Sequence, residues 1–552
     1  MSDASIPWPA VTSNGQARQK TLAADRGEVQ PTSLISYASS GHTLIIGESD
    51  TVVVAASKLG SVLSCSLLLA PGASTTDFSG TVYHAQVQSI SGHLGHFKVL
   101  VEQDGENTDL GALSRPGQPF FDLVLDLRDK PAIDSEVLPP GYYAPKAEVL
   151  NDAIEEMQTL VGGFEKPKYF VYDPQICAHG RSGLSGCTRC IDACPTKAIS
   201  SLADTIEVDP YLCQGAGSCS TACPTGAIVY AYPRAKDTLR HIKTMLASYR
   251  AAGGANPVLL LHDSEHGAEQ VASLAGNIPE NILPLMLEEI GSVGMDTWLA
   301  ALSYGASGVL LLCPDHVPAS VSHEMEHQVS IGRTLLQSMD YDENRIQIIK
   351  NSFAQKLSNN GLNETGIGAA GFAGMDEKRT TLRLATDHLF AQGNEKPEIV
   401  SLPDGAPFGR IMVDKQACTL CMACVSVCPA GALEAGGESP RLGFIEWNCV
   451  QCGICESACP EDAITREQRF LFDNDQRMRS RTLNEDQPFQ CIKCGKEFAT
   501  QSVMDKMQSK LKDHWMYQKP DALNRLKMCE DCRIEDMFQA EGGLTDSHRT
   551  IQ

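Results

Sequence analysis

The sequence predicts a multidomain protein of the α+β class. A chain of 552 residues is long enough for several domains of about 100 to 200 residues each. Strand-like and helix-like apolar patterns alternate along it, and one cysteine-rich pattern occurs twice. The character of the sequence changes at several points, and we expect domain boundaries there.

These boundaries divide the chain into seven parts. The first four are a disordered N-terminus (1–33), an α/β N-terminal domain (34–145), a first cysteine segment (146–234) and an α/β middle domain (235–350). A linker with a helix (351–405), a second cysteine segment (406–470) and a C-terminal four-cysteine region (471–552) follow.

The composition limits the choice of partners and of compartment. Lys and Arg total 45 against 68 Asp and Glu, which gives a net charge of −23. Nucleic acid and anionic membrane surfaces are therefore poor partners, and a basic protein face is a better one. The N-terminus lacks the basic and apolar stretches of a signal peptide, and the longest apolar runs are too short to cross a bilayer. We expect a cytoplasmic protein without membrane insertion, whose 21 cysteines serve mainly as metal ligands.

The N-terminal third contains no recognisable site. Residues 1–33 are rich in Ser, Ala, Gln and charge, a composition typical of disorder. The following domain contains the runs HTLIIGES, TVVVAAS, GHFKVLVE and FFDLVLDL, separated by Gly, Ser and Asp, and each run is typical of a short strand. The extended PPGYY at 139–143 ends this α/β domain.

The second cysteine segment contains the strongest motif, CTLCMACVSVCP followed by CVQCGICESACP. Three cysteines at two-residue gaps hold three corners of an iron-sulfur cube, and the cysteine before the proline reaches across to the other cube. The spacing therefore predicts two [4Fe-4S] clusters, one held by Cys418, Cys421, Cys424 and Cys459, the other by Cys449, Cys452, Cys455 and Cys428.

The first cysteine segment repeats this pattern with changes. CTRCIDACP is preceded by Cys177, and CQGAGSCSTACP follows after a strand-like stretch. The crossed rule assigns one [4Fe-4S] cluster to Cys187, Cys190, Cys223 and Cys177. Cys177 is separated from Cys187 by a longer loop than usual, but a loop insertion can return its ends to the same place at modest entropic cost. Both segments look like bacterial-type dicluster ferredoxin units.

The pattern breaks at the fourth cluster. Cys194, Cys213 and Cys219 are in register, but Ala216 occupies the position of the remaining thiol. Three interpretations follow: a [3Fe-4S] cluster held by three cysteines, a [4Fe-4S] cluster completed by solvent or another side chain, or an empty site. Each makes this site different from the other three.

Strands and helices alternate through the middle domain. The apolar runs PVLLLHD, ILPLML and GVLLLC are separated by helix-like stretches, which favours a small parallel sheet. The next region, 351–405, is predicted as a linker with a helix at DEKRTTLRLATDHLFAQ.

Four cysteines near the C-terminus form two further CxxC pairs. Cys491 and Cys494 lie in CIKCGK, and Cys529 and Cys532 lie in CEDCR. Four thiolates in two knuckles are typical of a structural Zn²⁺ site of the zinc-ribbon type, with a single rubredoxin-like iron as the alternative. Such a closed site leaves no open position for substrate, so we expect it to fold or dock the tail.

The sequence also resembles a known family over roughly residues 115–540. The stretches PPGYYAP, LVGGFEKPKYFVYDPQICAHGRSGLSGCTRCIDACPTKAI and PFQCIKCGKEF are similar to those of proteobacterial 4Fe-4S binding proteins encoded beside molybdenum-dependent formate dehydrogenases. The stretch ENILPLMLEEIGSVGMDTWLAALSYGASGVLLLC resembles the delta subunit of methyl-viologen-reducing hydrogenases. That domain binds a [2Fe-2S] cluster through several cysteines, of which only Cys313 is present here, so the resemblance implies a docking role alone.

These features predict an iron-sulfur electron-transfer protein. Its expected partner is a redox protein such as formate dehydrogenase. The alternative is an accessory or maturation factor for the metal centres of that enzyme. No nucleotide site, nucleophile or paired carboxylate stands out, so no catalytic residue is predicted, and a carrier or accessory subunit is favoured over a catalytic oxidoreductase.

Overall fold

The computed structural model describes residues 3–24, 29–74, 78–103, 105–114, 119–350, 367–437, 439–518 and 520–540. Residues 351–366, at the start of the predicted linker region 351–405, thus lie outside the described residues. The chain divides into two compact units. The larger unit comprises Met1–Pro174, Thr188–Leu202 and Ile206–Asn394, and the smaller unit comprises Gln175–Cys187, Ala203–Thr205 and Glu395–Gln552. Among the described residues, no helix has the length and hydrophobicity needed to span a bilayer.

In the larger unit, a five-stranded parallel sheet in the order β4-β3-β2-β8-β9 forms the N-terminal domain. Its strands are β2 (His42–Ile46), β3 (Ser64–Leu69), β4 (Thr81–His84), β8 (Leu123–Asp126) and β9 (Tyr142–Tyr143). All five residues of β2 are buried, as expected for a parallel strand covered on both faces. Ile45 packs into a core with α2 (Ser49–Leu59) and α4 (Leu150–Thr159).

The opposite face of this sheet is covered by antiparallel strands. Leu44 and Ile46 point away from Ile45 and pack against β6 (Lys98–Gln103), the central strand between β5 (Gln86–Ser91) and β7 (Glu106–Asp109). A short helix, α3 (Leu110–Ser114), follows β7. The domain is therefore α/β with an added antiparallel layer.

One predicted strand is a helix. The run TVVVAAS, which β-branched valines made strand-like, lies in α2. Its buried residues Val52, Ala55, Ala56 and Leu59 follow the i, i+3, i+4, i+7 spacing of a helix, whereas Val54 is 55% exposed. Burial of this one face against the sheet outweighs the local preference for strand.

The N-terminal segment, expected to be disordered, contains helix α1 (Ser13–Leu22). Thr12 caps the helix by accepting from the Gly15 N–H. The fully buried Arg18 donates to the carbonyl oxygens of Pro279 and Ile282, and α1 packs on α7 (Ala235–Ala251). The polar residues whose composition suggested disorder thus make specific contacts with the middle domain.

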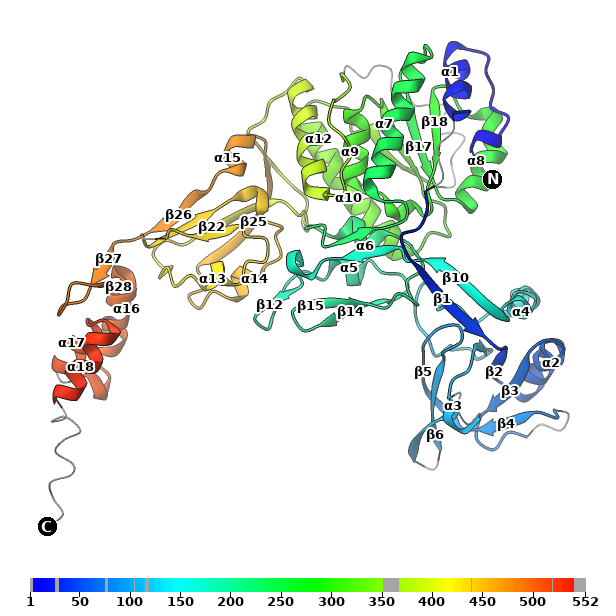
Figure 1. The fold of residues 1–552 in the computed structure, drawn as a ribbon, viewed down its shortest axis with the longest axis horizontal. Helices are drawn as coiled ribbons and strands as arrows, with labels where there is room; N and C mark the ends of the chain where they lie inside the picture. Colours follow the sequence, from blue (N-terminus) through cyan, green and yellow to red (C-terminus); the bar gives the residue numbers. More distant parts are fainter. Residues whose placement is uncertain are drawn as a thin grey trace. The chain divides into compact units, whose positions relative to one another are not determined.

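The middle domain is built on a four-stranded parallel sheet in the order β18-β17-β19-β20. The strands are β17 (Val258–His262), β18 (Ile282–Met286), β19 (Gly308–Leu312) and β20 (Ile346–Ile349). Its helices are α7, α8 (His266–Leu274), α9 (Met295–Ser303), α10 (Ala319–Ser338) and α12 (Lys378–Gln392). Figure 1 shows α7, α9 and α12 side by side, and α9 contacts both neighbours.

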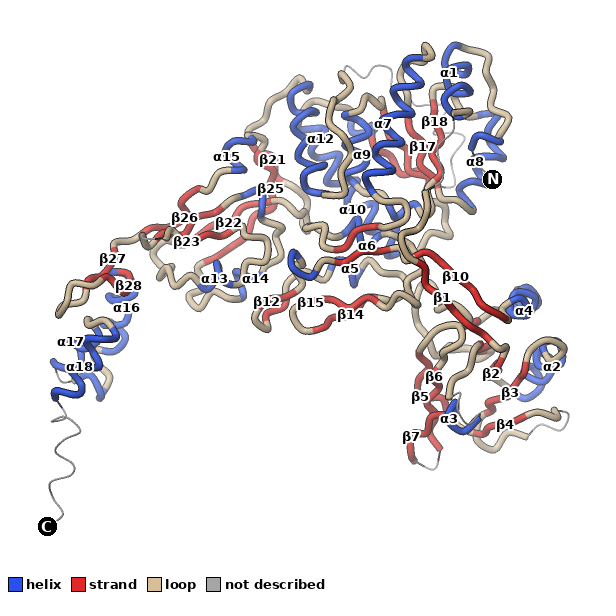
Figure 2. The backbone as a smooth tube through the Cα atoms, viewed as in Figure 1, coloured by secondary structure: helices blue, strands red, loops and turns tan. Residues whose placement is uncertain are grey.

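Short pairs of strands form part of the first cysteine segment. Strand β11 (Phe170–Tyr172) pairs with β16 (Ile228–Tyr230), and β14 (Ile199–Leu202) forms a hairpin with β15 (Thr205–Val208). Two helices, α5 (Arg189–Asp192) and α6 (Ser218–Ala222), follow its cysteine loops and contact each other. Strand β10 (Gly162–Pro167), near the start of this segment, pairs with β1 (Leu34–Ser39) (Figure 2).

In the smaller unit, strands of the second cysteine segment and of its flanks form two three-stranded antiparallel sheets. The first has the order β21 (Ile399–Ser401), β25 (Ile464–Leu471), β22 (Gly409–Val413). The second has the order β23 (Leu433–Ala435), β24 (Arg441–Phe444), β26 (Arg481–Glu485). Helices α13 (Ala423–Ser426) and α14 (Ile454–Ser457) follow the two cysteine loops, and α15 (Asn474–Met478) connects β25 to β26.

The C-terminal region of the smaller unit combines a hairpin with three helices. Strands β27 (Pro488–Gln490) and β28 (Glu497–Thr500) form the hairpin, and α16 (Gln501–Leu511), α17 (Pro520–Leu526) and α18 (Glu530–Ala540) follow. The described chain is thus a mixed α/β multidomain protein.

Candidate metal centres

The eight cysteines of the second cysteine segment line two cavities in two sets of four. One cavity is lined by Cys428, Cys449, Cys452 and Cys455. The other is lined by Cys418, Cys421, Cys424 and Cys459. Each set takes three cysteines from one loop and one from the other, which is the division that the spacing predicts. Three of these cysteines are buried in the apolar core of the segment and three are partly buried against it, whereas Cys421 is exposed.

Each of the two cysteine loops has two residues in the left-handed conformation, a geometry that we call the wrapped backbone. In the first loop, Leu420 and Met422 have φ of 55° and 61°. In the second, Gln451 and Gly453 have φ of 58° and 88°. Side chains other than glycine rarely adopt this left-handed conformation, and it clusters at ligand-binding positions. The two loops therefore share one specialised geometry.

Hydrogen-bond donors face the sulfur atoms. The amide N–H of Ala432 donates to Cys428 Sγ, and that of Ala463 donates to Cys459 Sγ, each at 3.3 Å. The Gln451 amide Nε2 donates to Cys449 Sγ at 3.2 Å. Such donors stabilise negative charge on sulfur and tune the potential of iron-sulfur centres. Cavity, backbone and donors all fit iron-sulfur cubes.

Burial keeps the metal-free cysteines of these two sets protonated. It raises the pKa of Cys449 to about 11 and the pKa of Cys424 to about 12. A thiol with such a pKa gives up its proton readily only when a metal ion replaces it. The Arg466 guanidinium lines the cavity that contains Cys452 and provides positive charge near that cysteine.

The long loop between Cys177 and Cys187 is a hairpin. Strands β12 (Gly180–Arg181) and β13 (Leu184–Ser185) pair, and the Cys187 N–H donates to the Ala178 carbonyl at 2.9 Å. The structure thus returns Cys187 to the residue next to Cys177, in the smaller unit. Their predicted partners, Cys190 and Cys223, are both buried and belong to the larger unit.

The cysteines of the incomplete set lie together in the larger unit. The pKa of Cys219 is well above its usual range, first because of burial and then because of the neighbouring thiols of Cys213 and Cys194. The loop with Ala216 has Gly215 and Gly217 at φ of 83° and 79°. These positions match Gln451 and Gly453 in the second cysteine segment, so the wrapped backbone is present although the fourth thiol is not.

A lysine and the middle domain enclose this loop. Lys166 Nζ donates to the carbonyl oxygens of Cys213 and Tyr211 at 2.7 and 2.9 Å, and burial lowers its pKa to about 8. A Cβ added to Gly217 would lie 2.4 Å from Ser292 Cα, so the middle domain touches the loop directly. No ligand pattern in the sequence marks Lys166, which only the fold brings to this site.

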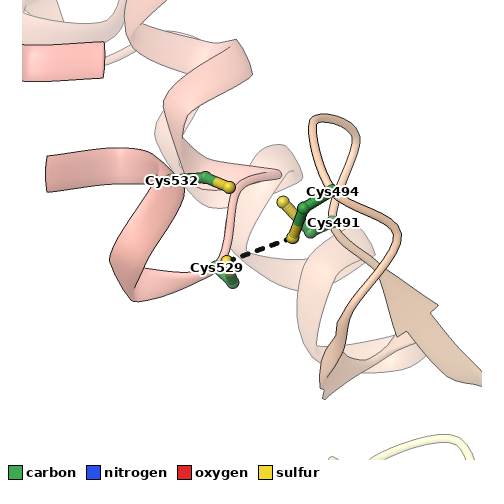
Figure 3. A group of neighbouring side chains, drawn as sticks. All are labelled: Cys491, Cys494, Cys529 and Cys532. Carbon is green, nitrogen blue, oxygen red and sulfur yellow. Dashed lines mark hydrogen bonds between the residues drawn. The ribbon is translucent and has the colours of Figure 1, made fainter. Parts of the chain in front are cut away.

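The four C-terminal cysteines converge, as Figure 3 shows, and their sulfur atoms lie within 4.8 Å of one another. Cys491 and Cys494 come from the β27–β28 hairpin, and Cys529 and Cys532 lie at the start of α18. The Sγ atoms of Cys494 and Cys529 are 3.6 Å apart, close to the roughly 3.8 Å separation expected around a tetrahedral zinc. Backbone amides, led by that of Cys529, outweigh burial and lower the pKa of Cys491 to about 6. The group could hold a metal ion.

Comparison with known families agrees with this geometry. The 4Fe-4S dicluster domain family matches residues 185–227 and 417–463. The family of the methyl-viologen-reducing hydrogenase delta subunit matches residues 258–360. No curated protein matches the chain. The chain therefore contains two 4Fe-4S dicluster ferredoxin domains, which indicate [4Fe-4S] clusters, and a domain similar to a hydrogenase delta subunit, a combination that indicates an iron-sulfur electron-transfer protein.

Proposed function

We propose that this chain relays single electrons through four iron-sulfur centres between a redox enzyme and another carrier. Iron-sulfur clusters, when bound, accept and release one electron at a time without rearrangement of bonds. The observation that carries the proposal is that each four-cysteine set of the second cysteine segment lines its own cavity, with donors aimed at sulfur.

The ligand sets follow from the spacing, and the two cavities of the second cysteine segment support the two sets proposed there. Three [4Fe-4S] clusters take the two sets of the second cysteine segment and the set of Cys177, Cys187, Cys190 and Cys223. The remaining site, held by Cys194, Cys213 and Cys219, takes a [3Fe-4S] cluster, because its loop keeps the wrapped backbone but has Ala216 in place of a ligand. Zn²⁺ occupies the closed site of Cys491, Cys494, Cys529 and Cys532.

The residues around the clusters have separate tasks. Amide donors stabilise charge on sulfur, while the apolar core limits the access of water to the buried cysteines. Lys166 and Arg466 place positive charge beside two different centres, which favours the more negative, reduced form of each. These charges should raise the potentials of their two centres above those of centres without such a neighbour.

The proposed partner is a molybdenum-dependent formate dehydrogenase. Support comes from the resemblance of residues 115–540 to proteins encoded beside such enzymes, and from the delta-subunit-like domain, which is consistent with a redox partner. The net charge of −23 favours a partner with a basic docking face.

A reduction experiment tests this role. The anaerobically purified protein is mixed with the dehydrogenase and formate, and visible absorption and low-temperature EPR are followed. We expect bleaching and new EPR signals that are absent when either component is omitted. Clusters that dithionite reduces but formate with the enzyme does not would contradict the proposed partner. Metal analysis should give about 15 iron atoms and one zinc per chain.

A deletion experiment separates this role from maturation. Dehydrogenase purified from a strain that lacks this protein should contain its normal molybdenum and iron if the protein carries electrons. A metal-deficient dehydrogenase would instead favour the accessory role.

A further inference from the structure

Three potential metal-binding side chains gather at the carboxyl edge of the middle-domain sheet. Asp263 directly follows β17, His266 begins α8, and His316 follows β19, which pairs in parallel with β17. One ligand atom from each lies within 4.8 Å of the other two. Loops at the carboxyl ends of parallel strands commonly hold ligands in open α/β sheets. This group is separate from every cysteine set described above.

The carboxylate of Asp263 is divided between two tasks. Its Oδ1 accepts from the amides of Glu265 and Gly267 at 3.0 and 2.9 Å, which fixes the side chain at the start of α8. Its Oδ2 is buried and has no hydrogen-bond partner among the described residues, although Asp263 is only 5% exposed. A buried carboxylate oxygen without a partner is costly, so it indicates a missing partner of positive charge.

The two imidazoles are placed to supply the other ligands. His316 Nε2 lies 3.8 Å from Asp263 Oδ2, too far for a hydrogen bond. Two ligand atoms at about 2.1 Å from a tetrahedral ion lie about 3.4 Å apart, so a shift of a few tenths of an ångström suffices. The rings of His266 and His316 are adjacent, with centroids 3.9 Å apart. The three groups can therefore meet at one ion.

The surroundings leave room for a cation and attract it. A Cβ on Gly267 would lie 2.8 Å from the free Oδ2, so glycine keeps space open beside this oxygen. Glu289 lies close enough to Asp263, Glu265 and Glu288 to interact electrostatically with each of them, so four carboxylates gather here. This concentration of negative charge lowers the energy of a bound cation.

We propose that Asp263, His266 and His316 bind one divalent transition-metal ion of the Zn²⁺ or Fe²⁺ class. Two imidazoles and one carboxylate are the ligands these ions prefer. Both histidines are exposed, so the ion keeps positions open to water or a small anion, unlike the closed four-cysteine site. The site is a mononuclear centre in addition to the iron-sulfur relay.

Zinc uptake by the complete, cluster-loaded protein tests the site. The protein is dialysed anaerobically against buffered Zn²⁺, and bound zinc and iron are measured by mass spectrometry. We expect the wild type to bind one zinc more than His316→Ala or His266→Ala. Both histidine side chains are exposed, so these two variants should fold normally. His323→Ala is the matched control, because His323 is an exposed histidine on α10 outside the group, and it should bind as the wild type does.

A second variant and a spectrum keep the result specific. Asp263→Asn retains an oxygen for the two amides but loses the anionic Oδ2, and should bind this zinc at least tenfold more weakly. Zinc X-ray absorption of the wild type should show nitrogen and oxygen neighbours that are lost in His316→Ala. Equal zinc uptake by the wild type and the histidine variants, or zinc with sulfur neighbours alone, would overturn the proposal.

Discussion

Ala216 shows how a single residue can change a centre while the chain around it stays the same. Gly215 and Gly217 adopt the left-handed conformation that Gln451 and Gly453 adopt in the complete site. The Tyr230 hydroxyl donates to the Gly215 carbonyl at 2.8 Å and helps hold this turn. Backbone wrapping is thus independent of the thiol, and the proposed three-iron centre reflects the missing ligand rather than a collapsed loop.

Restoring the thiol should complete the cluster. We expect Ala216→Cys to remove the three-iron EPR signal of the oxidised protein and to add about one iron atom per chain, because the fourth corner gains a ligand. EPR of oxidised protein together with iron analysis measures both effects. Ala216→Ser, which adds similar volume but no thiol, should keep the three-iron signal. A wild-type protein without such a signal, or an unchanged spectrum in Ala216→Cys, would refute the assignment.

The spacing of the cysteines allowed the complete sites to be predicted at the residue level. A CxxCxxCxxxCP motif limits the possible ligand sets strongly, and the fold brings the predicted four to each cavity of the second cysteine segment. No comparable sequence motif marks Lys166 or Asp263 as part of a site. Their roles depend on contacts between residues far apart in the sequence, which local spacing does not encode.

At the scale of elements, packing decided what local propensity did not. The valine-rich run in α2 was predicted as a strand, yet its apolar residues face the sheet with helical spacing. The buried strands β17 and β19 were predictable because they are uninterrupted apolar runs between helices. A short run rich in both valine and alanine is compatible with either structure, so only the tertiary contacts of α2 distinguish them.

A buried ion pair fixes the element that precedes the second cysteine loop. Glu446 begins a short helix that ends just before Cys449. Both carboxylate oxygens accept from Arg469 on β25 at 2.8 Å, and Arg481 on β26 also donates to Glu446. Burial alone would raise the pKa of Glu446, but the two arginines outweigh it and lower the pKa. The pair thus ties the loop to both sheets.

Removing this carboxylate should loosen the cluster site. We expect Glu446→Gln to destabilise the segment by about 3–5 kcal/mol, because Arg469 remains buried without its counter-charge. The measurement is the temperature at which the visible cluster absorption is lost under anaerobic conditions. Glu467→Gln is the control, since its pair with Arg410 is about one-third exposed and should contribute at most about 1 kcal/mol. Equal effects of the two substitutions would disprove this role for Glu446.

At the scale of the whole molecule, the two cysteine segments are not independent modules. The β12–β13 hairpin comes from the first segment, yet it belongs to the smaller unit and contacts α14 of the second segment. Gly186, next to the predicted ligand Cys187, faces Ile454, next to Cys455. The sequence predicts two repeats of one motif, but this packing between them arises only from the three-dimensional fold.

This contact gives a prediction for the complete chain. A Cβ at Gly186 would lie 2.6 Å from Ile454 Cγ1 and 2.7 Å from the Ala178 carbonyl oxygen, so Gly186→Ala must displace the hairpin or α14. We expect a loss of about 1–3 kcal/mol from overpacking and altered EPR signals of the clusters that Cys187 and Cys455 are proposed to bind. Anaerobic thermal bleaching and EPR of the reduced protein measure the two effects.

The control is Gly276→Ala, because no atom lies within 4 Å of a Cβ at that glycine. It should leave both the bleaching temperature and the spectra close to those of the wild type. Adding Ile454→Ala to Gly186→Ala removes the clash with Ile454 and leaves the one with the Ala178 carbonyl oxygen, so the double variant should lose less stability than the two single losses combined. Strict additivity, with unchanged spectra in Gly186→Ala, would mean that the hairpin lies against α14 without constraining it, and that each cysteine segment holds its clusters on its own.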